Sequence, residues 1–236
     1  MKSNNSYLNG LNKGIPIALG YLSVSFGFGI TSVGKGLTGL QAILISMTNL
    51  TSAGQIAGIG IIAACGTLIE MLLSQFVINI RYCLMGIALS QKLDKTFTTL
   101  HRLIASFGIT DEVFAVAASE NGLIGRRFMY GLITLPYIGW TVGTMLGAYA
   151  GYVLPDSVCS ALGIAIYSMF IAIIVPPSKT DRGVLAAVLI SSAMSCCFRY
   201  ISCFKSISQG FSIIICAFAT SALMALIAPK KEEEDE

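Results

Sequence analysis

The sequence contains few charged residues, and this scarcity excludes most soluble proteins. Only 11% of its 236 residues are Asp, Glu, Lys or Arg, whereas a soluble domain carries about 25%. Hydrophobic residues make up 55% of the chain, and the mean hydropathy is +0.77. A disordered chain or a nucleic-acid-binding domain would carry more charge, so both classes are excluded. The composition predicts an integral membrane protein that contacts the lipid bilayer.

Metal-binding and catalytic motifs are also missing. The chain has one histidine, His101, and seven cysteines without a C-x-x-C pair. Structural zinc needs clustered Cys and His ligands, so we expect no metal site and no cofactor. There is no paired His/Glu metal motif, no nucleophile elbow and no complete nucleotide-binding loop, so we predict that the protein is not an enzyme and is not driven directly by ATP.

Apolar tracts long enough to cross a bilayer fill most of the chain. A spanning helix needs about 20 mostly apolar residues. Such tracts occupy residues 14–33, 40–89, 128–154, 158–175, 184–203 and 207–228. The second tract is too long for one helix, and polar residues interrupt it at 52–55, at Glu70 and at 79–81. The mixed stretch 91–127 contains the segment 103–125. If this segment re-enters or crosses the membrane, the chain has eight apolar segments; otherwise it has six.

We therefore predict an all-α fold, a polytopic membrane helix bundle of six to eight segments with some broken helices. Residues 1–229 would form a single transmembrane transporter domain, and residues 230–236 an acidic cytoplasmic tail. The five acidic residues at 232–236 lower the net charge of the chain. The rest of the chain is basic, with 15 basic and 7 acidic residues.

Basic residues predict the orientation of the chain. Cytoplasmic loops of membrane proteins are enriched in Lys and Arg. Basic residues precede the first apolar tract, fill the middle region, occupy the loop predicted at 177–183 after Pro176-Pro177 and follow the last tract; Arg199 and Lys205 fall on the opposite side. The pattern predicts a multi-pass protein of the cell (inner or plasma) membrane with both termini in the cytoplasm.

A stripe of four glycines marks one later apolar tract. Gly139, Gly143, Gly147 and Gly151 recur at every fourth residue and lie on one face of a helix. Small residues at this spacing let helices approach closely in lipid. The stripe either packs inside the bundle or receives a second chain.

The first of three polar clusters is Thr51-Ser52-Ala53-Gly54-Gln55, which has apolar residues on both sides. Glycine allows a helix to break here, and a half-helix that begins at this point would direct its N-terminal dipole at an anion such as a carboxylate. The alternative is a simple turn between two spans.

The second cluster extends from Glu70 to Tyr82. Glu70 and Arg81 are 11 residues apart, so they share one face of a helix with Ser74, while Asn79 lies on the other side. A charge at the centre of a spanning helix costs about 2.5–3.5 kcal/mol on insertion scales, so such residues usually face a cavity or a partner. The alternative is that Arg81 extends toward the membrane surface.

The third cluster is Thr110-Asp111-Glu112. Adjacent carboxylates in an apolar stretch can raise the pKa of one of them, which suits proton coupling. Thr110 is also a good N-cap, and acidic residues are favoured in the first turn of a helix. The two roles are compatible.

These clusters resemble the AzlC/YgaZ family of branched-chain amino-acid exporters. The resemblance includes Gly14-Ile15-Pro16, Ala53-Gly54-Gln55, Asn79-Ile80-Arg81-Tyr82 and Thr110-Asp111-Glu112, in this order. It departs from the family in a later span, where an Asp often follows Leu-Gly but this chain has Leu162-Gly163-Ile164-Ala165.

The resemblance implies export of Leu, Ile, Val or similar amino acids, together with a small AzlD-type membrane subunit. By hypothesis, transport proceeds by alternating access and is proton-coupled. The substrate-binding residues would be Ser52, Gly54, Gln55, Asn79 and Arg81. The ammonium group or a coupling proton would be received by Glu70, Asp111 or Glu112. The alternatives are a transporter of another small amphiphilic solute and a non-transporting membrane subunit or channel.

Overall fold

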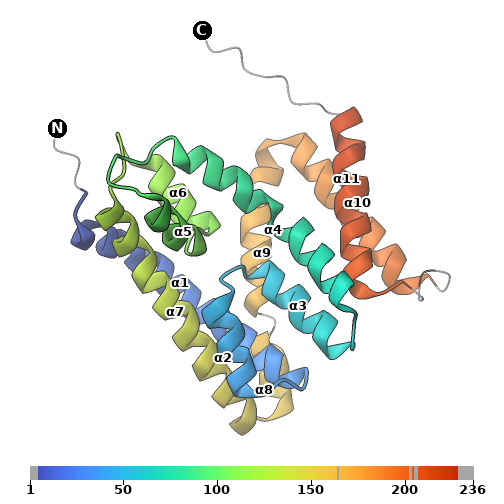
Figure 1. Cartoon of the computed structure of the whole chain (residues 1–236). Helices are drawn as coiled ribbons and strands as arrows, with labels where there is room; N and C mark the ends of the chain where they lie inside the picture. The colour runs from blue at the N-terminus through green and yellow to red at the C-terminus, as the bar shows by residue number, and fades with distance from the viewer. Residues whose placement is uncertain (1–4, 164, 202–203, 205–206, 228–236) are drawn as a thin grey trace. The chain divides into compact units, whose positions relative to one another are not determined.

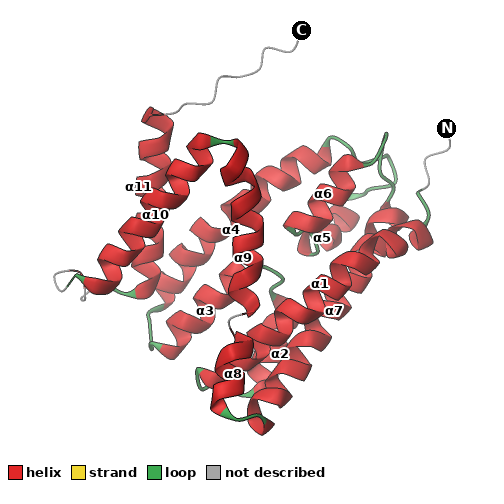
Figure 2. Ribbon diagram, turned by 180° about the vertical axis from the view of Figure 1, so that it is seen from behind, coloured by secondary structure: helices red, strands yellow, loops and turns green. Residues whose placement is uncertain are grey.

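The computed structural model describes residues 5–163, 165–201, 204 and 207–227, and Figures 1 and 2 show that this part is helical. The helices are α1 (Tyr7–Gly34), α2 (Gly39–Thr48), α3 (Ala53–Ala63), α4 (Leu68–Ser90), α5 (Thr99–Phe107), α6 (Asp111–Ser119), α7 (Arg126–Val153), α8 (Asp156–Gly163), α9 (Ala165–Thr180), α10 (Arg182–Tyr200) and α11 (Gln209–Ile227). The predicted acidic tail, Lys2, Lys205 and the departure at Ile164 lie outside the described residues.

The predicted all-α membrane bundle with broken helices is confirmed. Four helices, namely α1, α4, α10 and α11, are long and apolar enough to cross a bilayer, and α2 and α3 are shorter apolar helices. Helices α5 and α6 have nine residues each, which is about 14 Å at 1.5 Å per residue. The stretch 103–125 is therefore not one spanning helix.

The chain divides into two compact units. Unit 1 comprises Met1–Ile59 and Ile78–Ile166, and unit 2 comprises Gly60–Val77 and Tyr167–Glu236. Each unit is described by itself below. The single domain expected over residues 1–229 stays a prediction.

Helices α1 and α7 form the frame of unit 1 (Figure 1). They run parallel, because Gly10 approaches Phe128 and Gly29 approaches Thr144. A Cβ atom on Gly139 would lie 2.6 Å from the Ala18 carbonyl oxygen, and one on Gly147 would meet the carbonyl oxygen of Phe26. The glycine stripe is thus covered by α1. Internal packing is the correct alternative, and a second chain docked on this stripe is excluded.

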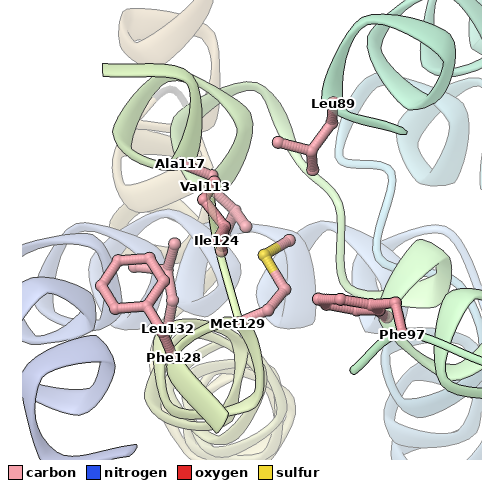
Figure 3. Packing of buried hydrophobic residues seen from close by; sticks show 9 residues of the cluster. Leu89, Phe97, Val113, Ala117, Ile124, Phe128, Met129 and Leu132 are labelled. Atoms are coloured by element: carbon pink, nitrogen blue, oxygen red, sulfur yellow. The ribbon is translucent and has the colours of Figure 1, made fainter. Parts of the chain in front are cut away.

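A cluster of buried apolar side chains holds α6 in place against α7 (Figure 3). Figure 3 shows Val113 and Ala117 of α6 close to Ile124, and Phe128, Met129 and Leu132 extending from α7 beneath them. All of these side chains are at most 1% exposed. This packing fixes the start of α6, where the third polar cluster lies.

Three features of the helices differ from the sequence pattern. Helix α4 is continuous through the polar residues at 79–81. It also contains Glu70, and the chain turns before that residue, where Cys65 has φ of +52° and Gly66 follows. The loop predicted at 177–183 is also wrong, because α9 continues to Thr180 and only Asp181 separates it from α10. Both prolines lie inside α9, so the backbone carbonyl oxygens four residues before them receive no N–H donor from these two positions.

Candidate functional site

An ion pair joins α4 to α6 inside unit 1. Arg81 Nη1 lies 2.7 Å from Asp111 Oδ2, and the two side chains are 44% and 34% exposed. The guanidinium also lies 5.1 Å from the centroid of the Tyr82 ring, a cation–π contact. The sequence left open whether Arg81 meets a partner; the structure identifies Asp111 as that partner.

The start of α6 confirms the capping role predicted for the third cluster. Thr110 Oγ1 accepts a hydrogen bond from the Val113 N–H at 3.3 Å, and Asp111 and Glu112 occupy the first turn. The positive end of the helix dipole favours negative charge there. Asp111 also pairs with Arg81, and Glu112 also contacts Tyr21. The cluster therefore has interactions beyond capping.

Asp111 retains its proton more readily than an ordinary aspartate. Burial raises the pKa of its carboxyl group, the positive charge of Arg81 opposes this rise, and the negative charge of Glu112 adds to it. The net direction is upward. A carboxyl group that is both paired and resistant to ionisation can exchange a proton as its partner moves away.

Glu112 binds a buried tyrosine of α1. The Tyr21 hydroxyl donates to Glu112 Oε2 and lies 2.6 Å from Thr110 Oγ1. Tyr21 is 6% exposed, and its ring meets that of Trp140 edge to face, with centroids 5.2 Å apart. The two adjacent carboxylates therefore have different partners, a cation for Asp111 and a neutral hydroxyl for Glu112.

A second polar group surrounds Gln55 at the start of α3. Ser52 has φ of +47°, so the predicted helix break occurs in the first cluster, and Gly54 lies in the first turn of α3. Gln55 is 1% exposed, and its Nε2 donates to Ser46 Oγ at 3.3 Å. Among the described residues, no group hydrogen-bonds Gln55 Oε1 or Ser52 Oγ.

Helix α7 connects the two polar groups. Ser46 Oγ lies 2.7 Å from Thr144 Oγ1, and Thr144 is one turn from Trp140, which packs on Tyr21. Residues i and i+4 share a helix face. One face of α7 thus contacts both the Gln55 group and the Tyr21–Glu112 pair. Trp140 Nε1 is buried, and within the described ranges it has no hydrogen-bond partner.

The structure does not gather all eight predicted site residues. Asn79 is two residues from Arg81 on the continuous helix α4, about 200° away around its axis, so they do not face the same way. Glu70 belongs to unit 2 and binds Ser208 and Gly210 of that unit.

Sequence reasoning missed four residues that complete the site: Tyr21, Ser46, Trp140 and Thr144. The sequence carried a signal for two of these residues, Trp140 and Tyr21. Trp140 is the single tryptophan of the chain, and it directly follows the first glycine of the stripe. Tyr21 is a polar aromatic residue inside the first predicted span.

The described residues contain no group of three or more His, Cys, Asp or Glu side chains that could hold a metal ion. A hollow of about 290 Å³ lies between α2 and the end of α7, and it is lined by Thr38, Gly39, Leu40, Ile43, Ala148, Tyr149 and Tyr152. None of the predicted site residues lines it.

Comparison with known proteins identifies relatives along most of the chain. The AzlC protein family profile matches residues 16–154. A membrane protein of Archaeoglobus fulgidus is 34% identical over 184 residues, covering 77% of this chain and 80% of its own. The inner membrane protein YgaZ of Escherichia coli is 24% identical over 197 residues, 80% of each chain. A membrane protein of Helicobacter pylori is 25% identical over 140 residues, 58% of this chain and 60% of its own. No solved structure matches.

Proposed function

Because the chain belongs to the AzlC family and is a multi-pass, transporter-like membrane protein, we propose that it exports branched-chain amino acids such as Leu, Ile and Val. The observation that carries this proposal is the Arg81–Asp111 ion pair. It places one positive and one negative group side by side, which is the arrangement that a zwitterion can replace with its own two charges.

Exchange of partners gives a mechanism for recognition. A substrate carboxylate takes the place of Asp111 at Arg81, and the substrate ammonium group takes the place of Arg81 at Asp111. Each charge stays paired throughout, so the exchange avoids an isolated charge in the membrane. Both side chains are partly exposed, so a solute can reach them.

The polar group around Gln55, which α7 links to Tyr21 and Glu112, supplies further contacts. Gln55 Oε1 and Ser52 Oγ lack hydrogen-bond partners in the described part of unit 1, and the N-terminus of α3 begins beside them, near Gly54. These groups can hydrogen-bond the ammonium and carboxylate groups of an amino-acid substrate. Asn79 would join them only after a rotation of α4, because it now faces away from Arg81. Exposed apolar side chains of α4 next to Arg81 in unit 1, namely Ile80 and Leu84, supply surface of the kind that an aliphatic tail requires.

Proton coupling follows from the same site. As pH falls, Asp111 takes up a proton and no longer attracts the substrate ammonium group, so a proton and the substrate compete for the same carboxylate. Glu112, held by Tyr21, or Glu70 in unit 2 is the alternative carrier. In alternating access, uptake and release of this proton would occur on opposite sides of the membrane.

A small AzlD-type membrane subunit belongs to the proposal, with a docking face other than the glycine stripe. The proposed location is the cell membrane, with both termini in the cytoplasm. One end of unit 1 supports this orientation: α1 and α7 both begin there, Lys13 pairs with Glu120, and Lys92 Nζ donates to the Glu120 carbonyl oxygen at 2.6 Å. Basic residues gathered at one end are typical of the cytoplasmic side.

Counterflow in proteoliposomes tests the proposed function. Vesicles that contain this chain and the AzlD-type subunit and are loaded with unlabelled leucine would accumulate labelled leucine or valine but not labelled lysine. Full activity in vesicles without the subunit would contradict the need for that partner. Equal accumulation of lysine would favour another amphiphilic solute. Labelled leucine that only leaks in, without saturation, would indicate a channel or a non-transporting subunit.

A further inference from the structure

Unit 2 contains a buried carboxylate whose contacts are all neutral. Glu70 is 4% exposed. Its Oε1 accepts hydrogen bonds from the Ser208 hydroxyl at 2.5 Å and from the Gly210 N–H at 2.8 Å. These donors, at the start of α11, stabilise negative charge on this oxygen. No cationic side chain forms an ion pair with Glu70 among the described residues.

A buried hydroxyl without a partner adjoins this carboxylate. Ser74 is 0% exposed, and its Oγ has no hydrogen-bond partner in the part of the chain that the structure describes. A Cβ atom on Gly210 would lie 2.7 Å from Ser74 Oγ and 2.6 Å from Glu70 Oε1. Both oxygens therefore border the same point, which stays open only because residue 210 is glycine.

The second carboxylate oxygen of Glu70 also lies beside a glycine, which places no side chain against it. A Cβ atom on Gly66 would lie 2.9 Å from Glu70 Oε2. Gly66 belongs to the turn before α4, where Cys65 adopts φ of +52°. That turn, α4 and the start of α11 direct no other charged group at Glu70 within the described ranges, and Cys65, the titratable residue of the turn, is exposed. An ionised carboxylate in these surroundings needs a compensating positive charge.

We propose that Glu70, Ser74 and Ser208 form a binding site for a monovalent cation, either Na⁺ or H⁺. Carboxylate and hydroxyl oxygens are the hard ligands that Na⁺ takes, and a proton on Oε2 would neutralise the same charge. The site would supply the coupling ion of the proposed transport, and it rests on that function only for this role. Cation binding is measured without any transported solute, so the two proposals fail separately.

The test uses the full-length protein in detergent, with thermal unfolding as the readout. Sodium chloride replaces choline chloride at constant ionic strength, at several pH values. We expect Na⁺ to raise the unfolding midpoint saturably at alkaline pH, and acid to remove this dependence because the proton occupies the carboxylate. Glu70→Gln should lose the response to both cations.

Ser74→Ala keeps both hydrogen bonds of Glu70 and removes one oxygen ligand. It should weaken the apparent affinity for the cation about tenfold, as expected for loss of one such interaction. The matched control is Ser191→Ala, since Ser191 Oγ donates to the Val188 carbonyl oxygen within α10; this variant should respond as the wild type does.

Each outcome decides the proposal. A pH response without a Na⁺ response, lost in Glu70→Gln, assigns the site to the proton. Wild-type responses to both cations in Glu70→Gln overturn it. If Glu70→Gln does not fold, Ser74→Ala decides, and an unchanged response to both cations in that variant also overturns the site.

Discussion

An acidic side chain has a charged partner in unit 1 and neutral partners in unit 2. In unit 1, Asp111 pairs with Arg81 at 2.7 Å. In unit 2, Glu70 binds only a hydroxyl and a backbone N–H in the described part of the chain. A pair of opposite charges suits a zwitterion, which can replace both partners at once. A carboxylate with neutral donors suits a single positive charge. Under the two proposals, the difference separates a solute site from a cation site within one chain.

The largest expected effect comes from removal of the cation in unit 1. Arg81→Ala should reduce leucine counterflow by more than about a hundredfold, because it leaves Asp111 unpaired and deletes the group that receives the carboxylate. Membrane insertion, measured by fractionation, should stay normal. Arg81→Lys is the matched control and should keep part of the activity, since it retains the charge but not the fork of donors. Normal counterflow in Arg81→Ala would remove the site from Arg81.

The next largest effect is expected on stability, where the helices α1 and α7 approach closely. Two glycines of the stripe, Gly147 and Gly151, form a matched pair for this test. Gly147→Ala places a Cβ atom against the Phe26 carbonyl oxygen, whereas the same atom on Gly151 would lie 3.5 Å from Val33 Cβ, an ordinary contact. We expect Gly147→Ala to lower the free energy of unfolding by about 1–3 kcal/mol and Gly151→Ala to change it by less than about 0.5 kcal/mol. Equal unfolding midpoints for the two variants would contradict the close approach of α1 and α7.

Asp111→Asn should remove the pH dependence of transport that we expect from the carboxylate paired with Arg81. Burial raises the pKa of Asp111, so its proton leaves at a higher pH than that of an ordinary aspartate. As pH rises through this pKa, the carboxylate becomes charged and available to the substrate ammonium group, and wild-type counterflow should rise. Asparagine cannot ionise, so the profile of the variant should be flat over this range. An unchanged rise in Asp111→Asn would leave Asp111 with capping alone.

A smaller effect is expected from Tyr21→Phe. The variant deletes the hydroxyl that donates to Glu112 but keeps the ring that packs on Trp140. Loss of one hydrogen bond to a charged group is worth about 1.5 kcal/mol, so counterflow should fall roughly tenfold. Tyr7→Phe is the control, because the Tyr7 hydroxyl bonds Thr134 outside the site. The proposed support of Glu112 fails if both variants transport equally.

The sequence predicted what depends on local chemistry. Thr110 caps a helix because its hydroxyl is three residues before the Val113 N–H, and the apolar tracts form helices because nothing else satisfies the backbone in lipid. The helix break beside Ser52 was also predictable, since glycine and polar residues gather there.

What depends on contacts between distant segments was not predictable from the sequence. Asp111 is 30 residues from Arg81, and packing between distant segments brings them together, with Leu89 of α4 and Val113 of α6 in one buried cluster. Residues Glu70 and Arg81 share a face of one helix, yet their partners belong to different units. The loop predicted after Pro176-Pro177 was wrong because α9 continues through both prolines to Thr180, although proline disfavours a helix interior.

The most direct test of the central claim is competition against labelled leucine by analogues that lack one charge. The amine 3-methylbutylamine lacks the carboxylate, and 4-methylpentanoate lacks the ammonium group. If Arg81 and Asp111 exchange partners with a zwitterion, unlabelled leucine and valine will compete in wild-type proteoliposomes and neither analogue will. Competition by either analogue as strong as that of leucine would contradict the exchange of both charges.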